Sequence, residues 1–137
     1  MEPYIHHVNY YETDAMRITH HSNYIRFMEE ARTDYLERLG MGYDKMEADG
    51  LVSPVISVEC KYLKTTTYAD DIQIYLYVEQ HTALKLVFGY VMKVRGEVVF
   101  TATSTHCFMD ANHRPVSLER RYPEFFQRLL ALQAPKD

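Results

Sequence analysis

The sequence predicts an α+β fold in which one antiparallel sheet of about five strands packs against a single long helix. Two observations lead to this prediction. Apolar residues recur at helical spacing over residues 24–39, and four later segments between residues 52 and 107 alternate apolar and polar residues as half-buried strands do. A short strand-like run at residues 4–9 precedes the helix, so the predicted order is one strand, one long helix and four strands.

The predicted helix has one apolar face. At about 100° per residue, five side chains fall on one stripe: Tyr24, Met28, Ala31, Tyr35 and Leu39. Ser22 or Asn23 can cap the start of this helix, and Gly40 is a natural stop after it. We therefore expect one face of the helix to be buried and the opposite, charged face to be wet.

The four later strands are expected to form an antiparallel meander. Residues 95–97 predict a tight hairpin and residues 80–83 another reversal of the chain. A short helical turn is expected at 43–49, and a terminal helix or arm at 122–132. This order of elements fits a curved sheet wrapped around one helix, the hotdog fold, although periodicity alone also leaves ferredoxin-like and cystatin-like arrangements open.

Composition bounds the class of protein. With 137 residues, 47% of them hydrophobic and 25% charged, the chain fits a single domain over residues 1–137. The net charge of −4 argues against general nucleic-acid binding. We find no segment that resembles a membrane span or a secretory signal, and we expect a cytoplasmic protein. Cys60 and Cys107 lie in strand-like runs and are expected to be buried, reduced thiols.

The most informative segment joins the first strand to the helix. It carries a lone carboxylate, Asp14, in a loop that feeds the helix start. Such a carboxylate can act as a base or a nucleophile, and the first backbone amides of a helix can hold the oxygen of a polarised carbonyl. The combination predicts acyl transfer. His20 and His21 lack a third ligand at metal-binding spacing, so we expect no metal site.

The same segment carries a family resemblance. YYETDAM at residues 10–16, HHSNY at 20–24 and FMEEAR at 27–32 together resemble the signature of the 4-hydroxybenzoyl-CoA thioesterase family, including its YbgC-like acyl-CoA thioesterases. The resemblance implies a hotdog fold and hydrolysis of a thioester to a free acid and a thiol, without a cofactor. It also implies that Asp14 is the catalytic carboxylate and that the amide at the His21 position polarises the thioester carbonyl.

Further residues of the block are candidates for substrate binding. The resemblance puts Asn23 and Tyr24 at the helix entry, beside the substrate. Glu29 either pairs with Arg32 or lines a pocket across a dimer interface. Arg17 departs from the family pattern, where Gly is common: a positive φ would strain it, and otherwise its guanidinium could face the CoA phosphates or the solvent.

The expected partner is an acyl-CoA substrate, with acyl-carrier-protein thioesters as the second class. Because one sheet leaves its edges open, we expect at least a homodimer with the site between subunits, and the resemblance adds a homotetramer of two dimers. Two rival functions remain: a non-catalytic module that binds acyl-CoA or acyl-carrier protein, and a hotdog hydratase or dehydratase. Asp14 argues against the first, and the absence of a suitable His with Asp or Glu argues against the second.

Overall fold

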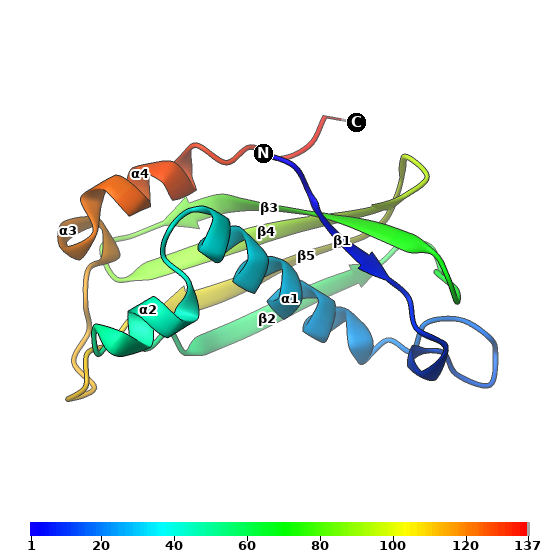
Figure 1. Cartoon of the computed structure of the whole chain (residues 1–137), viewed down its shortest axis with the longest axis horizontal. Coiled ribbons are helices and arrows are strands. Elements are labelled where there is room, and N and C mark those ends of the chain that lie inside the picture. Colours follow the sequence, from blue (N-terminus) through cyan, green and yellow to red (C-terminus); the bar gives the residue numbers. More distant parts are fainter. Residues whose placement is uncertain (137) are drawn as a thin grey trace.

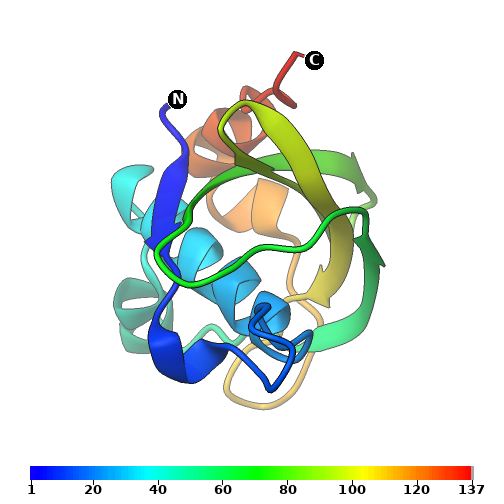
Figure 2. The same ribbon diagram turned by 90° about the vertical axis from the view of Figure 1, so that its right-hand side faces the viewer.

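The computed structural model describes residues 1–136 and contains one five-stranded antiparallel sheet in the order β1-β3-β4-β5-β2 (Figure 1). The strands are β1 (Tyr4–His7), β2 (Val55–Tyr62), β3 (Asp71–His81), β4 (Lys85–Val94) and β5 (Glu97–Cys107). The helices are α1 (Asn23–Arg38), α2 (Tyr43–Ala48), α3 (Leu118–Arg121) and α4 (Pro123–Leu130), with a 3₁₀ helix η1 (Tyr10–Glu12). Seen along its axis, α1 is enclosed by the curved sheet, as predicted (Figure 2).

Helix α1 buries the predicted face. Its buried apolar side chains are Tyr24, Phe27, Met28, Ala31, Tyr35 and Leu36. Leu39 caps the end of the helix, and Gly40 follows with φ +92°, a left-handed conformation that glycine adopts without strain. Ser22 is the N-cap residue, but its side chain makes no capping hydrogen bond. The helix therefore depends on packing against the sheet more than on its caps.

The inner face of the sheet supplies the other half of the core. Alternate residues of the three central strands point at α1 and are buried, among them Ile72, Ile74, Leu76, Phe88, Tyr90, Met92 and Phe100. The predicted hairpin between β4 and β5 is confirmed. Arg95 and Gly96 both have positive φ, +50° and +80°, as a two-residue hairpin turn with the twist of the sheet requires.

Strand β2 departs from the expected pattern of one packed face. It lies at the sheet edge, and Val55, Ile56, Val58 and Tyr62 are 39–50% exposed. Only Cys60 is half-buried along the strand. The reason is that β2 pairs with β5 on one side alone, at the edge of the sheet opposite β1. The single chain therefore leaves an exposed apolar edge strand.

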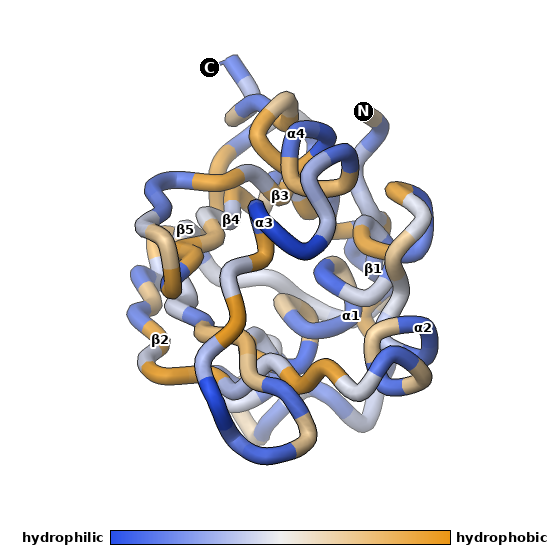
Figure 3. Tube along the Cα trace, turned by 90° about the vertical axis from the view of Figure 1, so that its left-hand side faces the viewer, coloured by the Kyte–Doolittle hydropathy of each residue, from blue (hydrophilic) through white to orange (hydrophobic). Residues whose placement is uncertain are grey.

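The C-terminal helices α3 and α4 lie at the end of the sheet opposite the start of α1 (Figure 1). The terminal helix predicted at 122–132 is α4, and a short helix that was not predicted, α3, precedes it, with Tyr122 between the two. Figure 3 looks onto this end and shows apolar stretches of α4 in orange. Arg128 Nε donates to the Leu39 carbonyl at 3.0 Å, and the Tyr122 hydroxyl donates to Asp49 Oδ2 at 2.9 Å. These contacts join the C-terminal helices to the end of α1 and to the segment after α2.

Three features bear on the composition-based expectations. Cys60 and Cys107 are free thiols but half-buried, not buried, and partial burial raises the pKa of Cys60. Over residues 1–136, no helix is long and apolar enough to cross a bilayer. In the same residues, no three His, Cys, Asp or Glu side chains gather as a metal site would require.

Candidate functional site

Residues 13–19 form a tight loop closed by a bridge between Thr13 and Thr19. Within it, the Asp14 amide donates to the Ile18 carbonyl at 2.9 Å, and the Arg17 amide donates to the Asp14 carbonyl at 2.9 Å. Figures 1 and 2 show this loop in blue, beside the N-terminal end of α1. Four consecutive residues thus reverse the chain, and Asp14 stands at the first position of the turn.

The Asp14 carboxylate is half-buried and partly engaged. Its Oδ1 accepts a hydrogen bond of 2.8 Å from the Met16 amide, two residues later, which is the geometry of an Asx turn. Its second oxygen has no hydrogen-bond partner in the part of the chain that the structure describes. One carboxylate oxygen is therefore oriented by the loop, and the other is available for a reaction.

The Asp14 loop is also fixed to the segment that precedes β3. Thr19 donates its amide to the Thr66 carbonyl at 2.8 Å, and the two threonine hydroxyls lie 2.6 Å apart. The Tyr24 hydroxyl lies 2.9 Å from Thr66 Oγ1. On the exposed side, Thr67 Oγ1 donates to the Arg17 carbonyl at 2.8 Å. The loop therefore has fixed contacts on both its buried and its exposed sides.

Glu12 connects the Asp14 loop to the start of α1. Its main-chain carbonyl accepts two hydrogen bonds, one from the His20 amide at 2.8 Å and one from the Asn23 side-chain amide at 2.9 Å. Asn23, expected beside the substrate, is buried and uses its side chain for this link. The Asp14 loop and the helix start are thus joined through a single carbonyl oxygen.

The start of α1 differs in detail from the expected row of unpaired amides. The Asn23 amide donates to the His20 carbonyl at 3.0 Å and the Tyr24 amide to the His21 carbonyl at 3.3 Å, because Ser22 already has helical dihedral angles. The amide of His21, the residue before Ser22, has no acceptor within residues 1–136. The available donor is therefore at the His21 position. No hydrogen bond joins Asp14 to His21 within residues 1–136.

The His21 ring lies in an aromatic cluster at the mouth of the site. It is exposed, stacks on His20 with centroids 4.3 Å apart, and meets the Tyr62 ring edge-on at 6.3 Å. The Tyr62 hydroxyl donates to the His21 carbonyl at 3.2 Å. Tyr24, a predicted substrate-binding residue, is buried behind this cluster and stacks on Phe100 at 4.8 Å; its burial raises the pKa of its hydroxyl.

The predicted ion pair between Glu29 and Arg32 is wrong. Arg32 is buried and donates instead to the hydroxyls of Tyr43 at 3.1 Å and Tyr90 at 3.0 Å. Glu29 is exposed and lines a shallow groove between α1 and β1. Because Glu29 and Arg32 project from different sides of α1, the sequence spacing of three residues does not bring them together.

Arg17 occupies the strained position that the family pattern suggested. Its φ is +66°, in the left-handed region that glycine adopts freely, and its side chain is exposed. The bulky residue is accommodated because the side chain points outward while the backbone makes the turn.

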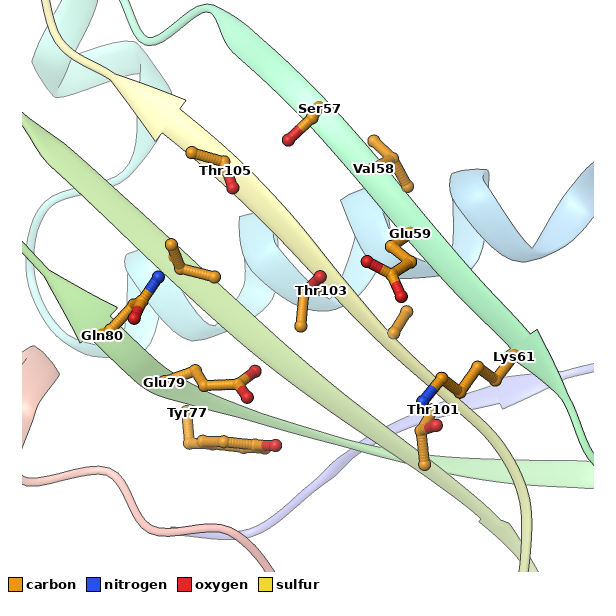
Figure 4. Close-up of a pocket in the computed structure, with 12 residues that line it drawn as sticks. Ser57, Val58, Glu59, Lys61, Tyr77, Glu79, Gln80, Thr101, Thr103 and Thr105 are labelled. Carbon is orange, nitrogen blue, oxygen red and sulfur yellow. The ribbon is translucent and has the colours of Figure 1, made fainter.

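A hollow of about 630 Å³ lies on the outer face of the sheet, away from α1, as Figure 4 shows. Thr101, Thr103 and Thr105 of β5 form its floor, with Glu59 and Lys61 of β2 on one side. None of the predicted site residues lines this hollow. Within residues 1–136 this hollow is therefore separate from the Asp14 loop.

Sequence reasoning missed two buried residues that support the Asp14 loop, Glu12 and His6. Asn9 and Glu12 have the three-residue spacing of a capping box, and the Asn9 amide donates to Glu12 Oε1 at 2.7 Å. That spacing was the available signal for Glu12. Nothing local marked His6, whose partners are Glu12 and Glu30 on two later elements.

The arrangement of sheet, central helix and loop agrees with known proteins. A family model described as the thioesterase-like superfamily matches residues 8–131. The chain belongs to the thioesterase-like superfamily. The match covers residues 10–32 and four of the five strands, β2 to β5. The resemblance found in residues 10–32 is therefore confirmed, and the chain is classed as a thioester hydrolase.

Individual relatives of this thioesterase-like chain agree. A Bacillus subtilis (strain 168) protein named "Putative acyl-CoA thioesterase YneP" is 33% identical over 120 residues, which are 86% of this chain and 87% of the relative. The crystal structure of a DHNA-CoA thioesterase from Staphylococcus aureus is 29% identical, with a TM-score of 0.85 over 95% of this chain and 91% of that one. A structure from Aquifex aeolicus is 34% identical, with a TM-score of 0.84 over 89% and 96%. The thioesterase-like chain therefore has the predicted hotdog fold.

Proposed function

We propose that this chain hydrolyses acyl-CoA thioesters, with Asp14 as nucleophile or general base and the His21 main-chain amide as the donor that polarises the carbonyl. The observation that carries the proposal is the double hydrogen bond to the Glu12 carbonyl, which joins the Asp14 loop to the residues on both sides of His21. Because one rigid unit carries both groups, the distance between carboxylate and donor is fixed before the substrate binds.

The chemistry requires few groups. In the general-base route, Asp14 takes a proton from water, the water oxygen bonds to the acyl carbon, and the carbon–sulfur bond breaks with its electron pair on the thiolate. In the nucleophilic route, Asp14 itself bonds to the acyl carbon while the carbon–sulfur bond breaks with its electron pair on the thiolate. Water then cleaves the mixed anhydride, which releases the acid and restores the Asp14 carboxylate. Thiolate is a good leaving group, so neither route needs a dedicated general acid. The second Asp14 oxygen, which has no partner within residues 1–136, is the atom proposed to react.

The proposed assembly is a homodimer formed along β2, with a tetramer of two such dimers as the larger form. The exposed apolar side chains of this edge strand support the proposal, since a second β2 paired antiparallel would cover them. Such pairing would bring the partner's Val55 end opposite Tyr62, next to His21. The test is the molar mass in solution, which we expect to fall to that of a monomer in Val58→Lys.

Acyl-CoA is the substrate that the named relatives favour, and acyl-carrier-protein thioesters are the second class. The test is thiol release from a panel of both, with wild type, Asp14→Asn and Asp110→Asn. Asp110 is a matched control, because its Oδ1 also accepts an amide hydrogen bond of 2.8 Å from the residue two positions later, Asn112. We expect Asp14→Asn to lower kcat at least 100-fold, as loss of a positioned base does, and Asp110→Asn to retain it.

Single turnover in H₂¹⁸O tests the nucleophilic route. Label in the Asp14 carboxylate would establish that route, because it enters there only when water cleaves a mixed anhydride at Asp14. Label in the released acid alone is expected for a general base, and also for an anhydride that water cleaves at the acyl carbon. Equal rates for wild type and Asp14→Asn would exclude both roles. Tight binding of acyl-CoA with no turnover of any thioester would favour the binding module instead.

A further inference from the structure

His6 of β1 bridges two carboxylates behind the Asp14 loop. Its ring is 6% exposed and stacks on Phe27 with centroids 3.9 Å apart. Nε2 lies 2.8 Å from Glu12 Oε1, and Nδ1 lies 2.9 Å from Glu30 Oε1. Both ring nitrogens of one buried imidazole therefore face carboxylate oxygens, from η1 on one side and α1 on the other.

The two carboxylate oxygens already act as acceptors toward other donors. Glu12 Oε1 accepts the Asn9 amide at 2.7 Å, and Glu30 Oε1 accepts the Tyr4 hydroxyl at 2.8 Å. Burial and the neighbouring Glu30 raise the pKa of Tyr4 to about 12, so this hydroxyl keeps its proton and donates. A carboxylate oxygen accepts several hydrogen bonds more readily than the O–H oxygen of a carboxylic acid does, so these contacts favour two ionised carboxylates. Toward two carboxylates, both contacts to His6 are donated by the ring, and only the imidazolium donates from both nitrogens.

We infer that His6 is held as an imidazolium between Glu12 and Glu30, and that this bridge is a positioning device for Asp14. Glu12 is the link: its side chain is fixed by His6, and its main-chain carbonyl receives the His20 amide and the Asn23 side chain. Asp14 follows Glu12 by two residues. Other charged groups line the same groove as Glu30, namely Arg26, Glu29, Asp34 and Glu37. Asp34 is paired with Arg38 at 2.6 Å.

The bridge acts on geometry and not on the substrate. Without it, the Glu12 side chain would lose its tie to α1, and Glu12 would keep only the hydrogen bonds from Asn9, His20 and Asn23. A displacement of about 1 Å can reduce a rate about 100-fold. The expected effect is therefore on kcat, with KM little changed. This positioning role rests on the proposed function, whereas the protonation state of His6 does not.

The first experiment records long-range ¹H–¹⁵N spectra of the histidine rings in the wild-type chain at neutral pH. We expect His6 to give the pattern of a ring protonated on both nitrogens, assigned by its loss in His6→Gln. His7 is the matched control: it is the next residue, is exposed, and has only Nδ1 bonded, 2.7 Å from Asp71. A neutral-tautomer pattern for His6 would overturn the inference, whether or not the chain is an active enzyme.

The second experiment compares kcat and KM of His6→Gln, Glu30→Gln and His7→Gln, each checked for a cooperative thermal transition. We expect kcat to fall about 10- to 100-fold in the first two variants with KM kept, and both constants to be kept in His7→Gln. Glu30→Gln preserves shape, so it tests the bridge even if His6→Gln fails to fold, and its spectrum should show a singly protonated His6. Folded Glu30→Gln with wild-type kcat would overturn the positioning role.

Discussion

Arg32 donates a hydrogen bond to the Tyr90 hydroxyl at 3.0 Å in the core, and no carboxylate within residues 1–136 lies at ion-pair distance from it. Since guanidinium only donates, the Tyr90 oxygen accepts this bond, and the Tyr90 hydroxyl can donate a hydrogen bond to Ser104 Oγ, 2.6 Å away. Ser104 in turn lies 2.7 Å from His106 Nε2. A chain of polar groups thus satisfies the buried charge across α1, β4 and β5.

Tyr90→Phe should reveal how much this row of hydrogen-bonded polar groups contributes to the free energy of unfolding. The change leaves a charged donor and a serine hydroxyl without their partner, which costs about 1–3 kcal/mol. Tyr75→Phe is the control, because Tyr75 lies on the outer face and its hydroxyl has no hydrogen bond in the described residues. Urea unfolding measures both variants. Equal losses of free energy of unfolding in Tyr90→Phe and Tyr75→Phe would contradict a stabilising role for these polar groups.

His106, at the end of this chain, should make stability depend on pH. Burial, and then the charge of Arg32, lower its pKa from 6.5 to about 4. Between these values the unfolded chain binds a proton that the folded chain does not, so the free energy of unfolding decreases as pH falls from 6.5 toward 4. One full proton corresponds to about 1.4 kcal/mol per pH unit. Above pH 6.5 the effect disappears, because His106 is neutral in both states.

The measurement is urea unfolding from pH 7 to pH 4 with wild type and His106→Gln. We expect the variant to have the shallower slope in this window, even if its stability at pH 7 is lower. His113→Asn is the control, since His113 is exposed and asparagine tolerates its φ of +60°. Parallel curves for wild type and His106→Gln would show that His106 takes up its proton equally in both states.

Local sequence predicted the elements but not the long-range polar contacts. The period of α1 and the positive φ at Gly40 are local properties, so the helix and its end followed from the sequence. Arg32 was paired with Glu29, three residues before it, whereas its partners Tyr43 and Tyr90 are 11 and 58 residues away along the chain. Which polar groups meet in a core depends on strand order, and no local pattern encodes it.

The candidate site shows the same division. The Asp14 loop was placed correctly before α1 because its residues are contiguous with the helix. The His6 bridge was missed because it joins β1, η1 and α1 in space. The exposure of β2 was also missed, since alternation along a strand does not tell whether its neighbour is in the same chain.

Gly89→Ala should destabilise the sheet through one neighbour. On the outer face, a Cβ at Gly89 would lie 2.3 Å from Cζ of Tyr77, whose ring covers this glycine from the paired position on β3. The ring must move, and overpacking of this kind costs about 1–3 kcal/mol. In the background Tyr77→Ala the same change should be neutral or slightly stabilising, because a strand glycine is itself unfavourable.

The double-mutant cycle tests this relationship by urea unfolding of both single variants and the double variant. A loss of stability that is the same in both backgrounds would show that the cost does not come from the Tyr77 ring. A loss that disappears in the Tyr77→Ala background would show that Gly89 is required by Tyr77 and not by the backbone of β4.

Arg17→Gly should stabilise the chain, although it lies in the candidate site. The left-handed φ of +66° costs an L-residue about 1–2 kcal/mol, and glycine removes this cost. Glycine also increases the conformational entropy of the unfolded chain, which lowers stability by about 0.4–1 kcal/mol. We expect a net gain of roughly 0.5 kcal/mol in thermal unfolding. Arg17→Ala removes the same guanidinium but keeps the strain, so it should show no gain.

The same pair of variants decides where the guanidinium acts. Arg17 is exposed and has no ion pair in the part of the chain described here, so we expect both variants to keep the wild-type KM for acyl-CoA. An equal rise in KM for both, absent with N-acetylcysteamine thioesters that lack the nucleotide phosphates, would instead put Arg17 at the CoA phosphates. Because glycine and alanine differ in backbone strain and share the loss of charge, stability and substrate binding are separated in one comparison.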